Sequence, residues 1–475
     1  MCYSGGVPRA GWVKPQDDQR LSDHVALGVL TSTFPPGLVD AVVEATGKAE
    51  QRNRLLPARL VVYYVCGLAL FSRSGYEEVM RSLVEGLSWE SGWKTRWMVP
   101  SQPAISQARA RLGPEPLAEL FERGCTPLAT EATPGGFLFG RRLVSMDGTT
   151  LDVPDTADNE TAFGRPGSAR GEGAAFPKLR IVAVAECATH AVFAAQIGPY
   201  STGENTLARS LAGSCTPGML VLADRGFGGS YELFSAFAAS GADLCWRARQ
   251  NAVLPVIERL SDGSFTSELV QRADRKTRSR VVPVRVVEYG IDDPGRPQAE
   301  ASTYRLVTTL LDPGEAPAAE LAGCYAQRWE IESVFDEMKS HQRGPAVVLR
   351  SKTPDGVRQE AWGYLCCHYA IRALIASAAS DRGVGPDRIS FTRTLHAARR
   401  STRSGLGTGT ETLTTALPAT LAEICRELVP DRPLRAAARV VKKKMSNYGL
   451  KRAAHRNWPQ PTRRPAAAIR IITAL

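Results

Sequence analysis

At 475 residues the chain is too long for a single compact unit, and its apolar content of 43% is that of a protein with well-filled cores. Its longest apolar run, Leu60–Phe71, is too short to cross a bilayer, and residues 1–20 lack the apolar stretch of a signal peptide. These features predict a cytoplasmic protein without a membrane segment, and the net charge of +11 favours an anionic partner.

The sequence also lacks the signatures of several enzyme classes. Its ten cysteines are scattered without a CxxC pair, which predicts reduced thiols and neither a zinc module nor a disulfide framework. No HExxH, GxSxG or GxxxxGK[ST] pattern occurs, so zinc hydrolysis, serine hydrolysis and ATP-driven work are not expected.

Residues 1–20 are expected to be flexible, and residues 21–132 follow a helical pattern. Within this region Ser101 is suited to cap a helix that begins near Pro103 and ends at Gly113. Polar residues would line its outer side: Gln102, Ser106, Gln107, Arg109 and Arg111. Because another helix precedes it after a short break, the segment is compatible with a helix-turn-helix-like DNA contact or with a plain helical hairpin.

A mixed α/β pattern occupies residues 135–245. The first strand, in residues 137–154, is expected to end in a turn at Asp147. Two strands joined by a turn near Ala188–His190 follow, and then a helix, a buried strand that stops at Asp224, a second helix and a further strand. This β-β-β-α-β-α-β order predicts a mixed-sheet α/β domain.

Residues 246–322 form a second, β-rich stretch, and residues 323–390 return to a helical pattern. The region 391–475 is basic. From residue 431 onward Asp431 is the only acid, and this segment carries the whole excess of +11. Its basic residues, which include Lys442, Lys443 and Lys444, suit a nucleic-acid backbone, although a solvated tail is the alternative.

The segment "YAQRWEIESVFDEMK", residues 325–339, has a distinctive helical pattern. At about 100° per residue, four of its polar side chains fall on one ridge beside an apolar face. They are Tyr325, Arg328, Glu332 and Lys339. Such a ridge is compatible with a functional site or with an ordinary salt-bridged surface.

Three acids stand where a site would form. Asp147 and Asp224 follow apolar strands, and Glu332 belongs to the ridge helix. In open α/β sheets, sites form beyond the carboxyl ends of strands. Carboxylates brought together there repel one another and require cations, and their hard oxygens favour Mg²⁺ or Mn²⁺. Arg225, together with the ridge cations, is of the type that holds phosphate.

These motifs resemble one known family. "DGTT" at Asp147, "ADRGF" around Asp224 and the Tyr-x2-Arg-x3-Glu-x6-Lys spacing from Tyr325 to Lys339 are similar to the DDE transposases of bacterial insertion sequences, and in particular to insertion-sequence family four. The segment "SQPAISQARARLG" also resembles the N-terminal domain of that family. The resemblance extends over about residues 20–450 and is specific, because four residues recur at the family's spacing after two aspartates.

The resemblance implies a ribonuclease H-like mixed-sheet catalytic domain, 135–245 and 323–390, interrupted by a β-rich insertion at 246–322. It further implies an all-α N-terminal DNA-binding domain at 21–132, with a basic C-terminal tail in the region 391–475. Asp147, Asp224 and Glu332 would be the catalytic acids and the ligands of two Mg²⁺ (or Mn²⁺) ions.

DNA phosphates would be held by Tyr325, Arg328, Lys339 and Arg225. The N-terminal helical domain, with Gln107, Arg109 and Arg111, would bind the specific terminal repeats. Lys442, Lys443 and Lys444 of the tail would add sequence-independent attraction to DNA phosphates. Trp246 or Trp329 would be available to stack on a displaced base, although core packing is the favoured role for both.

The expected reaction is cleavage at the ends of an insertion sequence and strand transfer into target DNA. Double-stranded DNA with terminal inverted repeats would be the substrate, and a homodimer would hold paired ends near the bacterial nucleoid. Two alternatives remain at this stage: a catalytically retired, transposase-derived DNA-binding protein, and a nuclease of the same fold that does not join strands.

Overall fold

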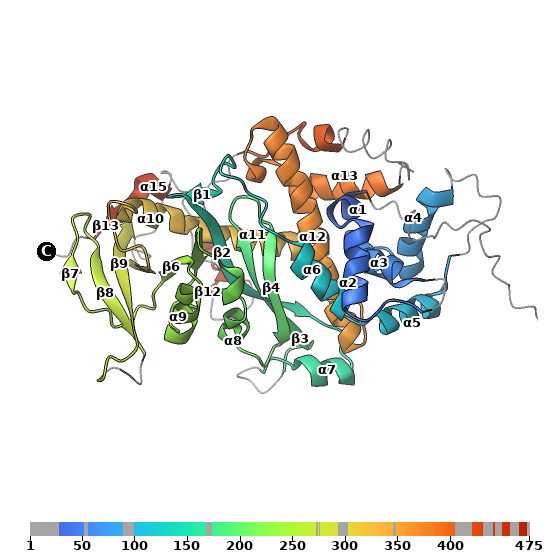
Figure 1. Ribbon diagram of the computed structural model, residues 1–475, viewed down its shortest axis with the longest axis horizontal. Helices are drawn as coiled ribbons and strands as arrows, with labels where there is room; N and C mark the ends of the chain where they lie inside the picture. Colours follow the sequence, from blue (N-terminus) through green and yellow to red (C-terminus); the bar gives the residue numbers. More distant parts are fainter. Residues whose placement is uncertain are drawn as a thin grey trace, which may run out of the picture.

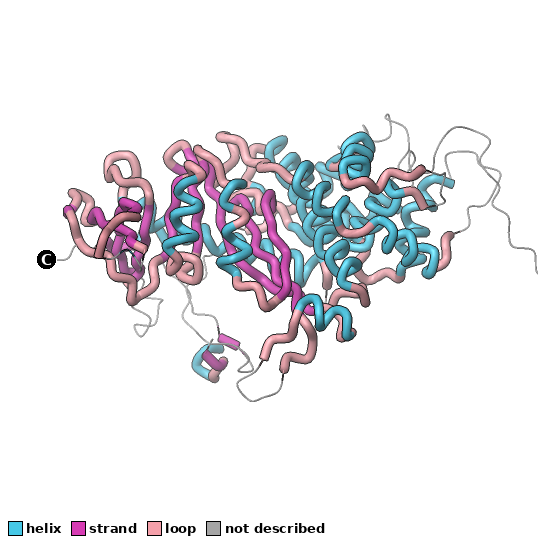
Figure 2. The backbone as a smooth tube through the Cα atoms, turned by 60° about the horizontal axis from the view of Figure 1, so that its bottom comes forward, coloured by secondary structure: helices cyan, strands magenta, loops and turns pink. Residues whose placement is uncertain are grey.

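The computed structural model describes residues 28–51, 56–88, 99–167, 173–271, 274, 276–292, 303–344, 348–403, 420–430, 440–441, 449–456 and 465–472. Helices gather at one end of the molecule, β7, β8 and β9 lie at the other end, and the central strands stand between them (Figure 1). Figure 2 shows the same separation of helices from strands in a second view.

The N-terminal region is helical, as the sequence predicts. Its helices are α1 (Val29–Thr33), α2 (Pro36–Ala45), α3 (Ala58–Leu70), α4 (Tyr76–Ser88), α5 (Gln102–Leu112) and α6 (Glu115–Gly124). The longest apolar run of the chain lies largely in α3, in which every residue except Arg59 is buried. Ser101 is the N-cap residue of α5, and Gly113 ends that helix at a φ of 72°, a conformation that favours glycine.

An eleven-stranded mixed sheet follows. Its strands are β1 (Phe137–Leu138), β2 (Arg141–Asp152), β3 (Lys178–Glu186), β4 (Val192–Pro199), β5 (Met219–Ala223), β6 (Asp243–Arg247), β7 (Glu258–Arg259), β8 (Phe265–Val270), β9 (Val281–Ile291), β10 (Tyr304–Thr308) and β13 (Ile469–Ile471). The main order is β4-β3-β2-β5-β6-β10-β9-β8-β7. β2, β3 and β4 are antiparallel, whereas β2, β5 and β6 are parallel, which confirms the expected mixed α/β fold of ribonuclease H type.

The remaining helices cover the sheet or extend the helical end. They are α7 (Ala157–Phe163), α8 (Glu204–Arg209), α9 (Tyr231–Ala239), α10 (Ala318–Tyr325), α11 (Glu330–Asp336), α12 (Pro354–Arg382), α13 (Phe391–Arg403) and α15 (Pro465–Ala468). A 3₁₀ segment, η5 (Ala326–Trp329), joins α10 to α11, and a π-helical segment, η6 (Glu337–Gln342), follows α11. The short strands β11 (Val440–Val441) and β12 (Gly449–Leu450) pair with each other outside the main sheet.

Alternating side chains of the central strands enter cores on opposite faces. Val144 and Met146 of β2 pack in the core that contains α8 and α9. Leu143, which precedes them on the same strand, packs on the other face with α10. Because successive side chains of a strand point to opposite faces of the sheet, Asp147 points away from α8 and α9 and toward the face that α10 and α11 cover.

The β-rich stretch 246–322 continues the central sheet, because β10 pairs with β6 and β9 pairs with β10. The chain returns to this stretch near its end. β13 pairs with β9, and Ala468 of α15 is buried. The last described residues of the basic region thus belong to the folded sheet.

The N-terminal helices share their hydrophobic core with distant segments. Buried residues of α3, α6, α12 and α13 form one cluster, which also includes Leu151, Ile181 and Ala183 from the sheet. Glycine at position 363 permits close packing of α12 on α3, since a Cβ there would lie 3.0 Å from the carbonyl oxygen of Val65. In the part of the chain that the structure describes, none of the helices has the length and apolarity that crossing a membrane requires.

Two local predictions were wrong. β2 does not turn at Asp147 but continues to Asp152, because residues 147–152 pair with β3. The segment 325–339 is not one regular α-helix, since it passes through the end of α10, η5, α11 and the start of η6.

Candidate active site

The first two acids meet where a short strand stops beside a longer one. β5 runs parallel to β2 and ends at Ala223, which pairs with Met146. The next residue on each strand is an aspartate, so Asp147 and Asp224 lie at neighbouring positions of the sheet. Asp147 is therefore beside a strand end, although it does not end its own strand.

The turn after β5 holds Asp224 in place. Its Oδ1 accepts a hydrogen bond from the backbone N–H of Gly226 at 2.7 Å, and its carbonyl oxygen accepts one from Gly228 at 3.0 Å. Both glycines are too closely surrounded for a side chain. A Cβ on Gly226 would lie 2.9 Å from Asp224 Oδ1, and one on Gly228 would lie 2.1 Å from the carbonyl oxygen of Arg247.

Tyr325 and Arg328 of the predicted polar ridge are buried beneath the site, so the ridge is not an ordinary salt-bridged surface. Both are 5% exposed. The hydroxyl of Tyr325 donates to the carbonyl oxygen of Ala223 at 3.3 Å, immediately before Asp224. Tyr325 therefore connects α10 to the end of β5.

Arg328 bridges two of the three acids. Its guanidinium lies 3.6 Å from Asp147 Oδ2 and 3.5 Å from Glu332 Oε1. Its Nε is buried without a hydrogen-bond partner. Because α11 follows Arg328 directly, one side chain joins the strand of the first acid to the helix of the third.

The three carboxylates share one electrostatic environment. The pKa of Asp147 is raised to about 7, chiefly by burial. Arg328 and the Gly148 N–H act to lower it, and the charges of Asp224 and Glu332 act with burial to raise it. Burial lowers the pKa of Arg328, but Tyr325 and the three acids outweigh it and leave that pKa raised. A region of concentrated negative potential therefore surrounds a single buried guanidinium.

The other predicted phosphate contacts lie around this centre. Arg225 is exposed directly after Asp224, and Lys339 is half-buried in η6, seven residues beyond Glu332. Trp329 is 36% exposed, and the guanidinium carbon of Arg328 lies 4.3 Å from the centroid of its ring, so core packing was the wrong role for it. Trp246 does pack in the core, edge-on to two phenylalanines of α9.

The proposed DNA-contacting helix α5 divides into two kinds of residue. Gln107 and Arg111 are exposed, as predicted. Arg109 is buried, which contradicts its predicted place on the outer side. Its guanidinium donates to Gln359, Ser351, Tyr76 and the carbonyl of Gly356, and so fastens α5 to α4 and α12.

Lys442, Lys443 and Lys444 lie outside the described residues.

The donor set suits hard divalent cations, since it consists of three carboxylates without a thiolate or imidazole. Within the described ranges, however, no three His, Cys, Asp or Glu side chains are arranged to hold a metal ion. Arg328 instead supplies the positive charge between Asp147 and Glu332. The chemistry of the three acids thus fits Mg²⁺ or Mn²⁺. In the structure, however, Asp147 and Glu332 are spaced to accommodate the guanidinium of Arg328 between them.

Sequence reasoning overlooked a group of buried charges behind the site, centred on Glu337 and Arg372. One signal was available. His368 and Arg372 are four residues apart in an otherwise apolar segment of α12, and charged residues buried in such a helix require partners.

Comparison with known proteins places the chain in a family. The model of the insertion element 4 transposase N-terminal domain matches residues 24–122, and that of the transposase DDE domain matches residues 138–370. The transposase InsG for insertion sequence element IS4 of Escherichia coli (strain K12) is 28% identical over 428 residues, which are 87% of this chain and 91% of that protein.

A putative transposase of the same organism, InsZ, is 24% identical over 213 residues, which are 45% of this chain and 68% of that protein. Among solved structures, a piggyBac transposase synaptic complex with hairpin DNA aligns with a TM-score of 0.42 and 11% identity, over 86% of this chain and 87% of that one. The two domain models lie in the order expected for one transposase, and the IS4 relative is matched over most of its length. The chain therefore belongs to the insertion element 4 family of DDE transposases.

Proposed function

We propose that Asp147, Asp224 and Glu332 are the catalytic residues with which this transposase cuts DNA at the ends of an insertion sequence and joins those ends to target DNA. The observation that carries the proposal is the shared electrostatic environment of three acids from three separate segments, two of them bridged by the buried Arg328.

The three carboxylates would hold two Mg²⁺ or Mn²⁺ ions. When bound, such a pair supplies activation of the attacking water or hydroxyl and stabilisation of the leaving oxygen. The protein's own contribution is to fix its ligands. Gly226 N–H orients Asp224, Gly148 N–H orients Asp147, and Tyr325 holds the end of β5 in register.

Positive side chains around the acids would hold DNA phosphates. Arg225 is exposed beside Asp224, and Lys339 follows Glu332 on the next helical segment. Arg328 is the third candidate, because its contacts with the acids are long and its Nε has no partner. Guanidinium groups bind phosphate oxygens through paired hydrogen bonds, which suits both arginines.

The exposed residues Gln107 and Arg111 of α5 are proposed to contact the terminal repeats. Assembly as a dimer on paired ends, acting on chromosomal DNA in the bacterial cytoplasm, is proposed from the family likeness alone.

The test uses DNA that carries the inverted repeats flanking the gene, incubated with the full chain and Mg²⁺. Cleavage at the repeat ends is expected for the wild type and should be absent from Asp224→Ala and Glu332→Gln, since an amide is a poor metal ligand. Both variants should still bind the repeats. Glu320→Gln, an exposed acid on α10, is the matched control and should cut normally.

Other outcomes would assign other functions. Binding of the repeats by the wild type without cleavage would identify a retired DNA-binding protein. Cutting that ignores the repeats would identify a nuclease. Retained cleavage in Glu332→Gln would remove Glu332 from the metal site.

A further inference from the structure

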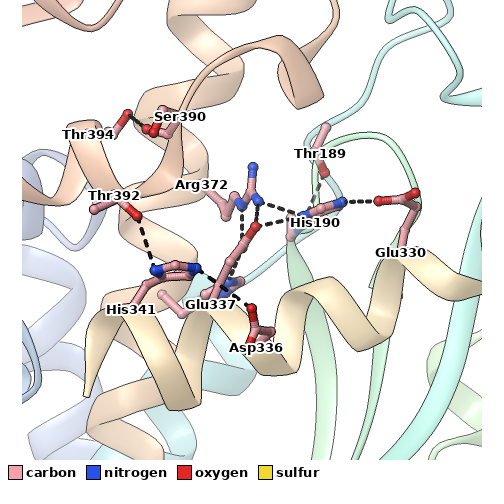
Figure 3. A network of polar contacts seen from close by, with 12 residues as sticks. Thr189, His190, Glu330, Asp336, Glu337, His341, Arg372, Ser390, Thr392 and Thr394 are labelled. Carbon is pink, nitrogen blue, oxygen red and sulfur yellow. Dashed lines mark hydrogen bonds and ion pairs between the residues drawn. The ribbon is translucent and has the colours of Figure 1, made fainter. Parts of the chain in front are cut away.

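A buried charged cluster lies behind the helix that carries Glu332 (Figure 3). At its centre is Glu337, the first residue of η6, whose carboxylate accepts hydrogen bonds from Arg372 and His368 of α12. His190, in the turn between β3 and β4, contacts the same carboxylate through Nδ1 at 3.1 Å. The other nitrogen of that ring, Nε2, lies 2.9 Å from Glu330 Oε2.

His190 therefore joins two acids on either side of Glu332. Glu330 begins α11 and precedes Glu332 by two residues, whereas Glu337 follows it by five. Figure 3 shows the imidazole of His190 between these two carboxylates. One ring thus connects the segment before Glu332 to the segment after it.

The charges of the cluster are matched. Burial raises the pKa of Glu337, but Arg372 and His190 outweigh it and hold that pKa well below its ordinary value. Burial and Arg372 lower the pKa of His190, but Glu337 and Glu330 outweigh them and leave it raised. Because an unpaired buried charge is costly, α11 is favoured in the placement that keeps Glu337 against Arg372 and Glu330 against His190.

The cluster also connects the helix to the sheet that carries the first acid. His190 follows β3, and β3 pairs with β2 so that Ala183 is opposite Asp147. The backbone of His190 is held in the left-handed region at a φ of 60°, which non-glycine residues seldom adopt. Such strain is maintained only where the surroundings demand it.

We propose that His190 is a positioning residue of this transposase: by bridging Glu330 and Glu337 it fixes α11 against the sheet and so sets the place of Glu332 relative to Asp147. This inference rests on the proposed role of Glu332. Groups behind a metal ligand orient it, and their loss costs metal affinity or activity without removing a ligand.

The first variant is Glu330→Ala, which removes the carboxylate at His190 Nε2 while leaving the buried Glu337–Arg372 pair intact. Mn²⁺ affinity of the complex with repeat DNA, measured by electron paramagnetic resonance, should weaken about ten- to a hundredfold. Affinity for the DNA itself should not change. Cleavage should require correspondingly more Mn²⁺ and recover when the ion is saturating.

The matched control is Asp336→Ala. Asp336 belongs to the same helix and carries the same charge, but its side chain is 63% exposed and contacts Ser340 and His341 instead of the buried cluster. Its loss should leave both Mn²⁺ affinity and cleavage at the wild-type level.

The second variant is His190→Asn, chosen because asparagine tolerates a positive φ better than most residues. Its shorter side chain cannot reach both carboxylates. We expect the same loss of Mn²⁺ affinity as in Glu330→Ala. The double variant should lose no more Mn²⁺ affinity than the weaker-binding single variant, because both changes break the same bridge.

Wild-type Mn²⁺ affinity in both folded variants would overturn the proposal. The proposal would also be overturned if the variants lost cleavage, had a lower melting temperature and did not recover at saturating Mn²⁺. That pattern indicates a purely structural role. The two proposals fail separately. Cleavage by Glu332→Gln would refute the proposed function. If Glu332→Gln is inactive but Glu330→Ala and His190→Asn bind Mn²⁺ as the wild type does, only the role of His190 is refuted.

Discussion

Arg328 determines the charge balance of the site. It contacts Asp147 and Glu332 at distances longer than a good ion pair, and it is buried where water cannot replace it. A cation held in this way offsets part of the negative charge while it remains displaceable. The protein without metal would therefore use Arg328 to keep Asp147 and Glu332 close.

Replacing this cation should destabilise the protein. In Arg328→Gln the repulsion among the acids is uncompensated, and the cost without metal is on the order of 3 kcal/mol. Mn²⁺ should then raise the melting temperature of the variant more than that of the wild type. Arg225→Gln, an exposed arginine beside Asp224, is the control and should melt like the wild type. An equal Mn²⁺ shift in Arg328→Gln and the wild type would contradict the bridging role.

Glu337 provides a pH-dependent prediction. Its folded pKa is well below the ordinary 4.5, so its stabilisation is present above that value and is lost as the pH falls through the folded pKa. At pH 7, Glu337→Gln should cost about 3–5 kcal/mol, because Arg372 loses its buried partner. The difference from the wild type should shrink at pH 3. Urea unfolding midpoints at the two pH values provide the measurement, and an unchanged difference would show that Glu337 is not the titrating group.

At the scale of elements, the order of strands and helices was predictable, whereas some of their ends were not. The turn near Ala188–His190, the strand that stops before Asp224 and the buried helix α12 all occur as predicted. The first strand was expected to end in a turn at Asp147, because an aspartate in such a place is often a turn former. Residues 148–152 instead continue β2, since β3 offers pairing partners to all of them and these partners are remote in sequence.

The pattern of the segment 325–339 correctly brought Arg328 near Glu332 but left open whether the ridge was a site or a solvated surface. The 100° rule assumes a regular α-helix, whereas η5 is tighter and η6 is wider. Burial of Tyr325 and Arg328 follows from their contacts with β2 and β5, which a single helical segment does not reveal.

Helix α5 offers a comparison between two arginines. Arg109→Ala should destabilise the protein by about 3 kcal/mol, because its buried, charged hydrogen bonds to α4, α12 and the loop before α12 all disappear at once. Arg111→Ala, whose side chain is 38% exposed and pairs with Glu50, should cost about 1 kcal/mol or less. Chemical denaturation separates the two. If Arg109→Ala instead weakened DNA binding at unchanged stability, its role would be in DNA contact after all.

At the scale of the molecule, the sequence indicated separate regions, but their packing depended on contacts that span the chain. The N-terminal helices share a core with α12 and α13, and β13 adds the end of the chain to β9. Composition located the basic C-terminal region correctly but could not show that residues 465–472 return to the sheet. The reason is that β13 gains its partner, β9, from a segment far away in sequence.

This return determines how the basic region should be tested. Deleting residues 431–475 would remove β13 and the buried Ala468 together with the charge, so a loss of DNA binding could reflect a damaged sheet. Replacing Lys442, Lys443 and Lys444 by glutamine leaves those packed residues in place. If these lysines bind phosphates, the slope of log K against log salt should become shallower by about 0.9 for each phosphate that is no longer neutralised. Replacing the same three by arginine keeps the charge and should keep the slope. A slope that stays the same in the glutamine variant would place the DNA path away from these lysines and leave phosphate binding to the groups around Asp224 and Glu332.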